Sequence, residues 1–257
     1  MSTEVEAARV ITLEEAPRDS LTSPGMTIFT ALDVYHDYTP HSAAMNMAID
    51  EALLDHATLP SIRFYRWHSP ALSFGYFGRF TDVASHSIER DLIRRWTGGG
   101  IVFHGDDLTY SIVIPGVDSA FAESSISIYE SVHRALRSVL IADGERAELA
   151  AETTPNVQRP TLNAQLIGNK SCFANPVRAD VMVNGRKIAG AAQRRTQRGL
   201  LHQGSIQGVE LENGLAKRFA QELSANCSEC EIDRKVLNRA RELAQCKYGT
   251  DAWLRKR

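Results

Sequence analysis

The sequence has little of what marks a specialised class of protein. Its 257 residues contain only four cysteines, and 29 lysine and arginine residues nearly balance 31 aspartate and glutamate residues, for a net charge of −2. Without a net basic charge, the chain has no general electrostatic attraction to nucleic acid or to an anionic membrane. It also lacks the run of about 18 apolar residues that a membrane-spanning helix requires. We therefore expect neither nucleic acid nor a membrane as a partner.

The cysteines are too few for a disulfide framework in a chain of this length. Residues 1–26 are acidic and have neither the basic start nor the apolar core of a secretory signal, which predicts a weakly ordered tail on a cytoplasmic protein. In a reducing compartment all four cysteines should be free thiols. Cys227 and Cys230 have the spacing of a zinc-binding pair but no second pair accompanies them, so we expect two thiols on a loop between helices and no metal site.

Apolar periodicity predicts an α+β fold in which a mixed β-sheet is flanked by helices. Strands are expected at 27–35, 61–67, 71–78, 101–104, 108–115, 179–183, 186–195 and 199–210. Helices are expected at 42–57, 82–90, 125–142, 212–224 and 232–246. Residues 145–170 have no period and predict a long surface loop.

Some of these segments carry finer predictions. The apolar stripe of the helix at 42–57 leaves Asn46, Asp50 and Asp55 away from the core. Thr81 is a candidate cap for the short helix that follows it. The strands at 61–67 and 71–78 are expected to lie in one sheet.

A tight hairpin is predicted where Asn184-Gly185 separates two apolar strands. This pair accepts the positive φ values of a type I′ turn, which suits the right-handed twist of the strands on either side. Lys187 is thereby placed just past the turn.

A glycine-rich segment is the first candidate for binding chemistry. Gly98, Gly99 and Gly100 follow Arg94 and Arg95, and glycine amides beside two guanidinium groups can hold a phosphate or a carboxylate. The alternative is a plain glycine turn between strands, with arginines at the surface.

Two histidines follow apolar runs at strand positions. His104 precedes a Gly-Asp-Asp sequence beside the glycine turn, and His202 lies within the strand at 199–210. A lone histidine of this kind is either a structural residue with satisfied hydrogen bonds or a member of a site.

Cys172 is the candidate nucleophile. It lies in the sequence GNKSCFANP, near Lys170 and before the hairpin that carries Lys187. A thiol reacts as the thiolate, and a nearby ammonium favours that form. The alternative is an inert, buried cysteine.

Several separated motifs resemble the biotin/lipoate protein ligase superfamily. They are RRWTGGGIVFHGDDLTYSIVIP, SCFANPVRADVMVNGRKIAGAAQRR and LLHQGSI, supported by NMAIDEALL, RFYRWHSPALSFGYF and LAQCKYGTDAWL. The resemblance runs from about Met45 to Leu254 and is nearest to the cysteine-dependent octanoyltransferases and their lipoate-protein ligase A-like relatives. It implies a catalytic domain over 27–210, with a helical part at 211–257 packed on the same domain.

The resemblance also implies an acyltransferase and roles for individual residues. Octanoyltransferases take an octanoyl group from acyl carrier protein, hold it as a thioester on a cysteine and deliver it to a lysine of a lipoyl domain, in a glycine cleavage H protein or a 2-oxoacid dehydrogenase E2. Cys172 matches the nucleophile and Lys187 the lysine that assists it. The residues that match the substrate pocket are Arg95, Gly98, Gly99, Gly100, His104, Gly190, Gln193 and His202.

Gly100 departs from the octanoyltransferase pattern. Those enzymes have arginine as the third residue of the turn, whereas glycine is found in lipoate ligases, which form an acyl adenylate from a free acid with ATP and Mg. The transferase interpretation implies no cofactor, while the ligase alternative requires ATP and Mg. A biotin ligase is disfavoured because the chain has no GRGRR-type loop. A non-catalytic binding module on the same fold is the third alternative.

Overall fold

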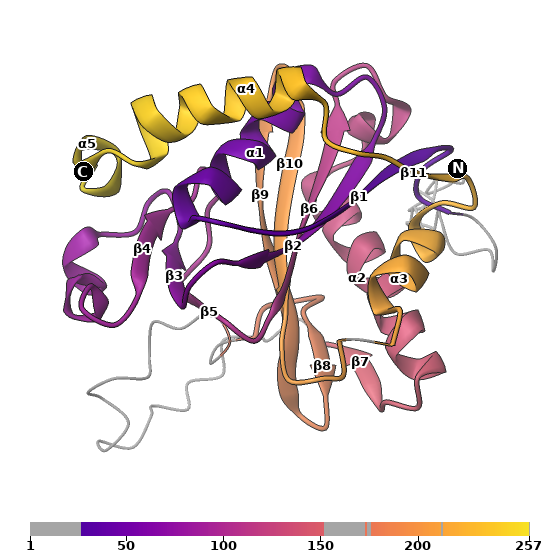
Figure 1. Cartoon of the computed structure of the whole chain (residues 1–257). Coiled ribbons are helices and arrows are strands. Elements are labelled where there is room, and N and C mark those ends of the chain that lie inside the picture. The colour runs from indigo at the N-terminus through magenta and orange to yellow at the C-terminus, as the bar shows by residue number, and fades with distance from the viewer. Residues whose placement is uncertain (1–26, 152–172, 174–175, 212, 257) are drawn as a thin grey trace, which may run out of the picture.

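The computed structural model describes residues 27–151, 173, 176–211 and 213–256. The predicted tail at 1–26, most of the predicted loop at 145–170, and Cys172 lie outside the described residues. Within the described part, the architecture is a large mixed sheet covered by helices, with a small second sheet at one end (Figure 1).

Eight strands of the described chain form the large sheet, in the order β11-β1-β2-β6-β10-β9-β8-β7. Their bounds are β1 Leu32–His41, β2 Ser61–Trp67, β6 Leu108–Pro115, β7 Ala147–Leu149, β8 Val181–Val183, β9 Arg186–Thr196, β10 Gly199–Ile206 and β11 Cys227–Glu229. β1 runs parallel to β2 and to β11, whereas the pairs from β2 to β7 are antiparallel. Cys227 is therefore on an edge strand rather than on the predicted loop.

The small sheet has the order β4-β3-β5 among the described residues. Its strands are β3 Ala71–Phe74, β4 Asp91–Arg94 and β5 Val102–His104. The helices are α1 Ala43–His56, α2 Ser125–Ala142, α3 Leu215–Leu223, α4 Arg234–Leu243 and α5 Asp251–Leu254, with a π-helical turn at Ala244–Tyr248 after α4.

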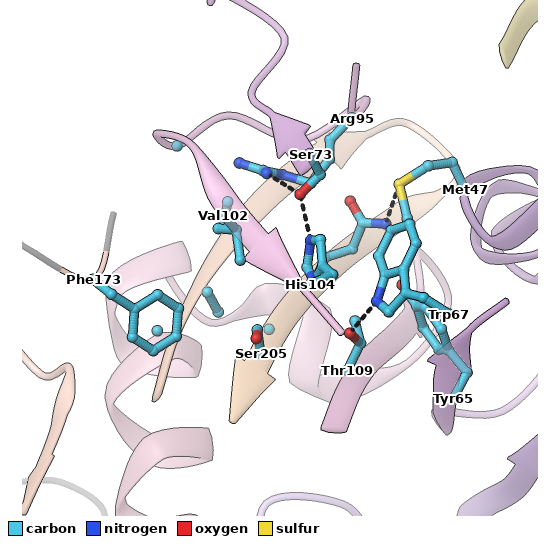
Figure 2. Close-up of a pocket in the computed structure, with 16 residues that line it drawn as sticks. Met47, Tyr65, Trp67, Ser73, Arg95, Val102, His104, Thr109, Phe173 and Ser205 are labelled. Carbon is cyan, nitrogen blue, oxygen red and sulfur yellow. Dashed lines mark hydrogen bonds between the residues drawn. The ribbon is translucent and has the colours of Figure 1, made fainter. Parts of the chain in front are cut away.

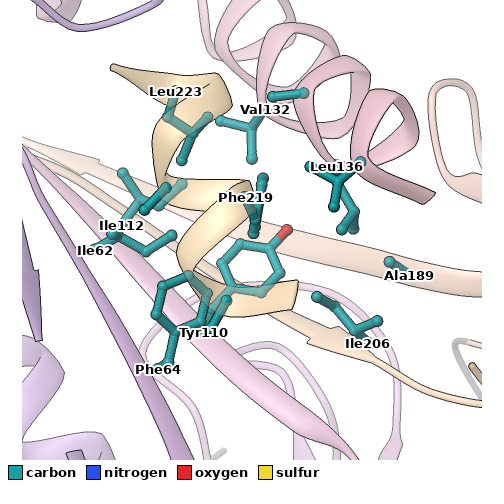
Figure 3. Close-up of a cluster of buried hydrophobic side chains, with 14 of the residues drawn as sticks. Ile62, Phe64, Tyr110, Ile112, Val132, Leu136, Ala189, Ile206, Phe219 and Leu223 are labelled. Atoms are coloured by element: carbon teal, nitrogen blue, oxygen red, sulfur yellow. The ribbon is translucent and has the colours of Figure 1, made fainter. Parts of the chain in front are cut away.

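Helices cover both faces of the large sheet and close two hydrophobic cores. On one face α2 and α3 bury Val132, Leu136 and Phe219 against strand residues such as Ile62 and Tyr110 (Figure 3). On the other face α1 lies over β2, β6 and β10, and α4 packs against α1. The apolar periodicity predicts α2, α3 and α4 because each has an apolar stripe to bury, whereas α1 also buries polar side chains.

Local signals fix where the best-predicted elements begin and end. The hydroxyls of Ser42 and Ser124 accept hydrogen bonds from backbone amides in the first turns of α1 and α2. Helix α2 ends just before Gly144, which has a φ of 89°. The hairpin between β8 and β9 is confirmed, with Asn184 at φ 50° and Gly185 at φ 75°.

Two sequence predictions are wrong in this region of the fold. The segments at 61–67 and 71–78 belong to different sheets, because β3 pairs with β4 and β5 rather than with β2. The helix predicted at 82–90 is replaced by 3₁₀ turns at Phe80–Asp82 and Ala84–His86, and Thr81 caps neither. Val83 is buried but Ile88 is 94% exposed, so this segment has no apolar stripe to support a full helix.

The prediction that Asn46 and Asp50 face away from the core is also wrong. Both are fully buried, because Arg63 on β2 is buried opposite them and binds both side chains. The guanidinium lies 2.8 Å from the Asp50 carboxylate, which pairs the two buried charges.

Candidate functional site

A pocket that opens to solvent lies where the large and small sheets meet. The residues that line it include apolar side chains from several strands and from α1 (Figure 2): Met47, Tyr65, Trp67, Val102, Phe173, Ala191 and Ala192. Four of the predicted site residues also line it: Arg95, Gly99, His104 and Gly190. The lining of the pocket suits a mostly apolar ligand.

His104 is anchored on both sides. Its Nδ1 lies 2.8 Å from the carboxylate of Asp107, its Nε2 lies 2.6 Å from the hydroxyl of Ser73, and its ring stacks on Trp67 with centroids 4.1 Å apart. Both ring nitrogens therefore contact protein groups, and the ring presents a face and an edge to the pocket.

Asp107 is the buried anion behind this histidine. Burial alone would raise the pKa of Asp107, but the charge of and hydrogen bond from His104, with the hydroxyls of Ser205 and Thr109, lower it to about 2. The carboxylate is thus ionised and accepts every one of these hydrogen bonds.

Arg95 holds the glycine turn. Its Nη2 donates to the carbonyl oxygens of Gly98 and Gly100 at 2.9 and 2.8 Å, and its Nη1 donates to Ser73 Oγ at 2.6 Å. The three glycines do lie together beside the pocket, with Gly99 in its wall at φ 83°.

Arg94, the other arginine of the motif, holds backbone segments together. Its guanidinium donates to backbone carbonyls of Tyr76, Gly78, Trp253, Leu254 and Lys256. It therefore joins the loop after β3 to α5 and the residues that follow it.

Lys187 and Asp180 form a buried ion pair. The sequence predicts Lys187 as a site residue but does not point to Asp180 as its partner. Lys187 Nζ lies 2.7 Å from the Asp180 carboxylate, and both side chains are almost completely excluded from solvent. Tyr129 on α2 donates to Asp180 at 2.6 Å, and the backbone amide of Val177 donates at 2.6 Å. Burial and the charge of Asp180 raise the pKa of Tyr129, which keeps the phenol neutral and able to donate.

Gly190 has a clear spatial reason to be glycine. A Cβ at this position would overlap with Cε and Nζ of Lys187, whose side chain crosses the Cα of Gly190. Gly190 also lines the pocket, so the ammonium lies at the pocket's edge.

A second, more polar pocket adjoins the first. It is lined by Pro176, Met182, Gly185, Arg186 and Gln207, together with Phe173 and Lys187. Phe173 lies in the walls of both pockets, and Lys187 Nζ lies 5.5 Å from the centroid of its ring. Lys187 is therefore placed where the two pockets adjoin.

Gln193 and His202 are brought together, but apart from the described wall of the pocket. They are paired across β9 and β10, and Gln193 Nε2 lies 3.0 Å from His202 Nδ1. His202 packs against the rings of Tyr110, Tyr129 and His133. Burial, followed by the nearby His133, lowers the pKa of His202 well below its usual range, so the ring is neutral.

Gln203 is a pocket residue that the sequence reasoning missed. It lies one position after His202, and its amide donates to Asp50 at 2.7 Å while its carbonyl oxygen accepts from Thr97 at 2.8 Å. Alternation along β10 was the available signal, because Leu201, Gln203 and Ser205 share the face opposite His202.

Two further findings bear on the class of site. Among residues 27–151, 173, 176–211 and 213–256, no group of three His, Cys, Asp or Glu side chains is arranged to hold a metal ion. None of the helices in that part of the chain is long and apolar enough to cross a membrane.

Comparison with known proteins identifies the family. A family model described as the lipoyl protein ligase A/B catalytic domain matches residues 42–246. The chain belongs to this family. The match contains α1, the glycine turn, the Lys187 hairpin and β10, so the features around the pocket are those of a lipoyl protein ligase A/B domain.

Individual members of the family resemble the chain in sequence and in fold. The octanoyltransferase LipM of Oceanobacillus iheyensis is 35% identical over 182 residues, which cover 65% of this chain and 61% of that protein. A lipoate-protein ligase A bound with ATP superposes with a TM-score of 0.68 at 22% identity, covering 87% of this chain and 98% of that one.

A putative lipoate protein ligase from T. acidophilum with bound lipoic acid gives a TM-score of 0.67 at 24% identity, with the same coverage of 87% and 98%. These likenesses confirm the predicted superfamily and its catalytic-domain fold. This chain spans only 61% of the length of the LipM relative.

Proposed function

We propose that this lipoyl protein ligase family member is an octanoyltransferase of lipoate biosynthesis. It would move an octanoyl group from acyl carrier protein to a lysine of a lipoyl domain, with a thioester on Cys172 as the intermediate and without a cofactor. The LipM relatives, named octanoyltransferases at 31–36% identity, support this assignment. A lipoyl domain of a glycine cleavage H protein or of a 2-oxoacid dehydrogenase E2 is the proposed acceptor.

The proposed chemistry has two acyl transfers. The thiolate of Cys172 attacks the donor thioester carbonyl, the bond to the donor sulfur breaks, and the donor leaves as a thiolate that takes up a proton. The amine of the acceptor lysine then attacks the new thioester, the bond to Cys172 breaks, and the amine loses a proton. The donor is already activated, so neither step requires a nucleotide.

The position of Lys187 is the observation that carries the proposal. Its ammonium lies at the edge of the apolar pocket, where the octanoyl chain would bind, and beside the polar pocket, where donor and acceptor would approach. Phe173, which follows Cys172 in the sequence, lies against this ammonium. A positive charge there would stabilise the Cys172 thiolate and the oxyanion that forms on the acyl carbonyl.

Gly100 favours a second candidate function, an ATP-dependent lipoate-protein ligase. The glycine at this position is the ligase residue, and the superposed fold is that of a lipoate-protein ligase A bound with ATP. In that case the free acid would be activated as an acyl adenylate with ATP and Mg.

The nucleotide requirement separates the two functions. We expect a lipoyl domain to gain the mass of one octanoyl group when incubated with the protein and octanoyl-acyl carrier protein alone. Modification only with free octanoate or lipoate plus ATP and Mg would establish the ligase. Binding of the lipoyl domain without modification under either condition would indicate a non-catalytic module.

Gly190→Ala is expected to lower the rate of octanoyl transfer by at least about tenfold, equivalent to about 1.4 kcal/mol in the barrier. The new methyl group would displace the Lys187 ammonium from the edge of the pocket. Single-turnover transfer from octanoyl-acyl carrier protein measures the effect. Gly105→Ala is the matched control, because a Cβ there meets no atom within 4 Å. Equal rates for both variants would contradict the proposed position of Lys187.

A further inference from the structure

Two buried hydrogen-bond chains converge on the Gly98–Gly100 turn. Each begins at a carboxylate inside the protein, Asp107 in one chain and Asp50 in the other, and both carboxylates are at least 98% buried. The first reaches the turn through Arg95, and the second reaches Thr97, the residue before Gly98.

The first chain runs from Asp107 through His104 and Ser73 to Arg95. The ionised Asp107 can only accept, so His104 Nδ1 donates to it. Nε2 of His104 shares a 2.6 Å hydrogen bond with the Ser73 hydroxyl. Arg95 can only donate, and its Nη1 donates to the oxygen of Ser73. The chain links the Arg95 guanidinium to the Asp107 carboxylate through Ser73 and His104.

The order Ser73, His104, Asp107 is also the order of a serine hydrolase triad. The position of Arg95 argues against a nucleophilic serine, because the guanidinium already occupies one side of Ser73 Oγ at 2.6 Å. Ser73 is also fully buried on β3. The arrangement therefore favours a structural hydroxyl that orients Arg95.

The second chain leads from the core of the large sheet. Asp50 accepts from Gln203 at 2.7 Å, and Gln203 accepts from Thr97 at 2.8 Å. Asp50 itself is fixed by Arg63, Ser111 and Tyr65. The hydroxyl of Thr97 is therefore hydrogen-bonded to a residue that lines the pocket.

The turn also fits tightly against its neighbours. A Cβ at Gly75, directly after β3, would overlap with backbone atoms of Gly98 and Gly99. A Cβ at Gly99 would come within 3.2 Å of both Ala192 and Arg95. Space around the turn thus allows little movement, in agreement with the two chains.

We infer that Ser73, His104, Asp107, Gln203 and Thr97 are positioning residues that hold the turn in its ligand-binding shape before the acyl group arrives. With its carbonyls held by Arg95, the turn has a fixed shape at the pocket wall, and binding does not require it to be ordered. This inference rests on the proposed function for the identity of the ligand. It assigns these side chains an effect on affinity rather than on the chemical steps.

The test compares variants that cut one chain at a time. Ser73→Ala removes the acceptor of Arg95, and Thr97→Val removes the hydroxyl of the second chain at nearly constant volume. The probe is a methylene analogue of S-octanoyl-pantetheine, in which CH₂ replaces the thioester sulfur, and its binding is measured by calorimetry. Each variant is expected to bind about tenfold more weakly, equivalent to about 1.4 kcal/mol, with kcat changed less than about twofold.

Two control variants and one independent measurement sharpen the result. Thr97→Ser keeps the hydroxyl and should restore the affinity to within about twofold. Ser224→Ala removes an equally buried hydroxyl, bonded to the backbone of Asn226, and should have no effect. Hydrogen exchange at the amides of residues 97–101 should be faster in Ser73→Ala and Thr97→Val than in the wild type, and this measurement needs no ligand.

The outcomes distinguish this inference from the proposed function. Unchanged affinity and unchanged exchange in both variants would overturn the inference while leaving the octanoyltransferase intact. A fall in kcat without a change in affinity, or labelling of Ser73 by a fluorophosphonate, would overturn it in favour of a chemical role. If the wild type does not bind the analogue, the proposed ligand is wrong, and the exchange rates alone decide whether the chains hold the turn.

Discussion

Cys172→Ser is expected to abolish octanoyl transfer while leaving the fold unchanged. The thiolate is both a strong nucleophile and a good leaving group, and a serine ester would be neither formed nor aminolysed at a comparable rate. Incubation of the wild type with octanoyl-acyl carrier protein alone should add one octanoyl group that neutral hydroxylamine removes. Mass spectrometry should place this group on Cys172 and find none on the serine variant.

The other three cysteines are the matched controls. Cys227 and Cys230 lie on or beside the edge strand β11, and Cys246 is exposed in the π-helical turn after α4. Burial raises the pKa of both Cys227 and Cys230, which disfavours their thiolates. Serine at any of these positions should leave transfer nearly unchanged, and a stable acyl group on one of them would refute the assignment of Cys172.

Asp180→Ala is expected to lower the free energy of unfolding by about 3–5 kcal/mol, the usual cost of removing one partner from a buried ion pair. Lys187 would keep its position inside the protein but lose the carboxylate 2.7 Å away. Tyr129 would lose its acceptor at the same time. Urea unfolding monitored by fluorescence measures the stability, and single-turnover assays should find transfer strongly reduced.

A double variant separates stability from function at this pair. Asp180→Leu combined with Lys187→Met replaces both charges by apolar groups, and we expect it to recover most of the lost stability. It should remain inactive, because the ammonium is absent. A double variant that is stable and active would mean that the ion pair serves folding alone.

The residues predicted best are those with signals in the local sequence. Asn184-Gly185 determines a turn by its own backbone preferences, so the place of Lys187 on β9 follows without knowledge of the rest of the fold. Helix α2 was predicted for the same kind of reason, since its apolar stripe is continuous. Gly98 to Gly100 were recognisable as a turn from composition.

The residues missed are those whose positions depend on a distant partner. Asp50 is polar by every local criterion, and only the burial of Arg63 on another strand makes its buried position stable. Ser73 is a similar case, since Arg95 reaches it from a neighbouring segment of the small sheet. Asp180 was missed although Lys187 lies just across the predicted hairpin, because a turn signal does not show which side chains pair. A periodicity analysis places such side chains at the surface, because it uses the polarity of each residue and does not consider a buried partner that could pair with it.

The run Gly190-Ala191-Ala192 on β9 bears on the acyl chain that the proposed octanoyltransferase would accept. All three residues line the apolar pocket, so its width depends on small side chains at adjacent positions of one strand. Gly190 packs against the end of the Lys187 side chain, and Ala192 packs against Gly99 of the glycine turn. In the proposed octanoyltransferase, a larger residue at 192 would narrow the pocket beside the glycine turn, whereas a side chain at 190 would displace the Lys187 ammonium. In the proposed enzyme, chain-length preference and the position of the reacting groups therefore depend on different residues of the same strand.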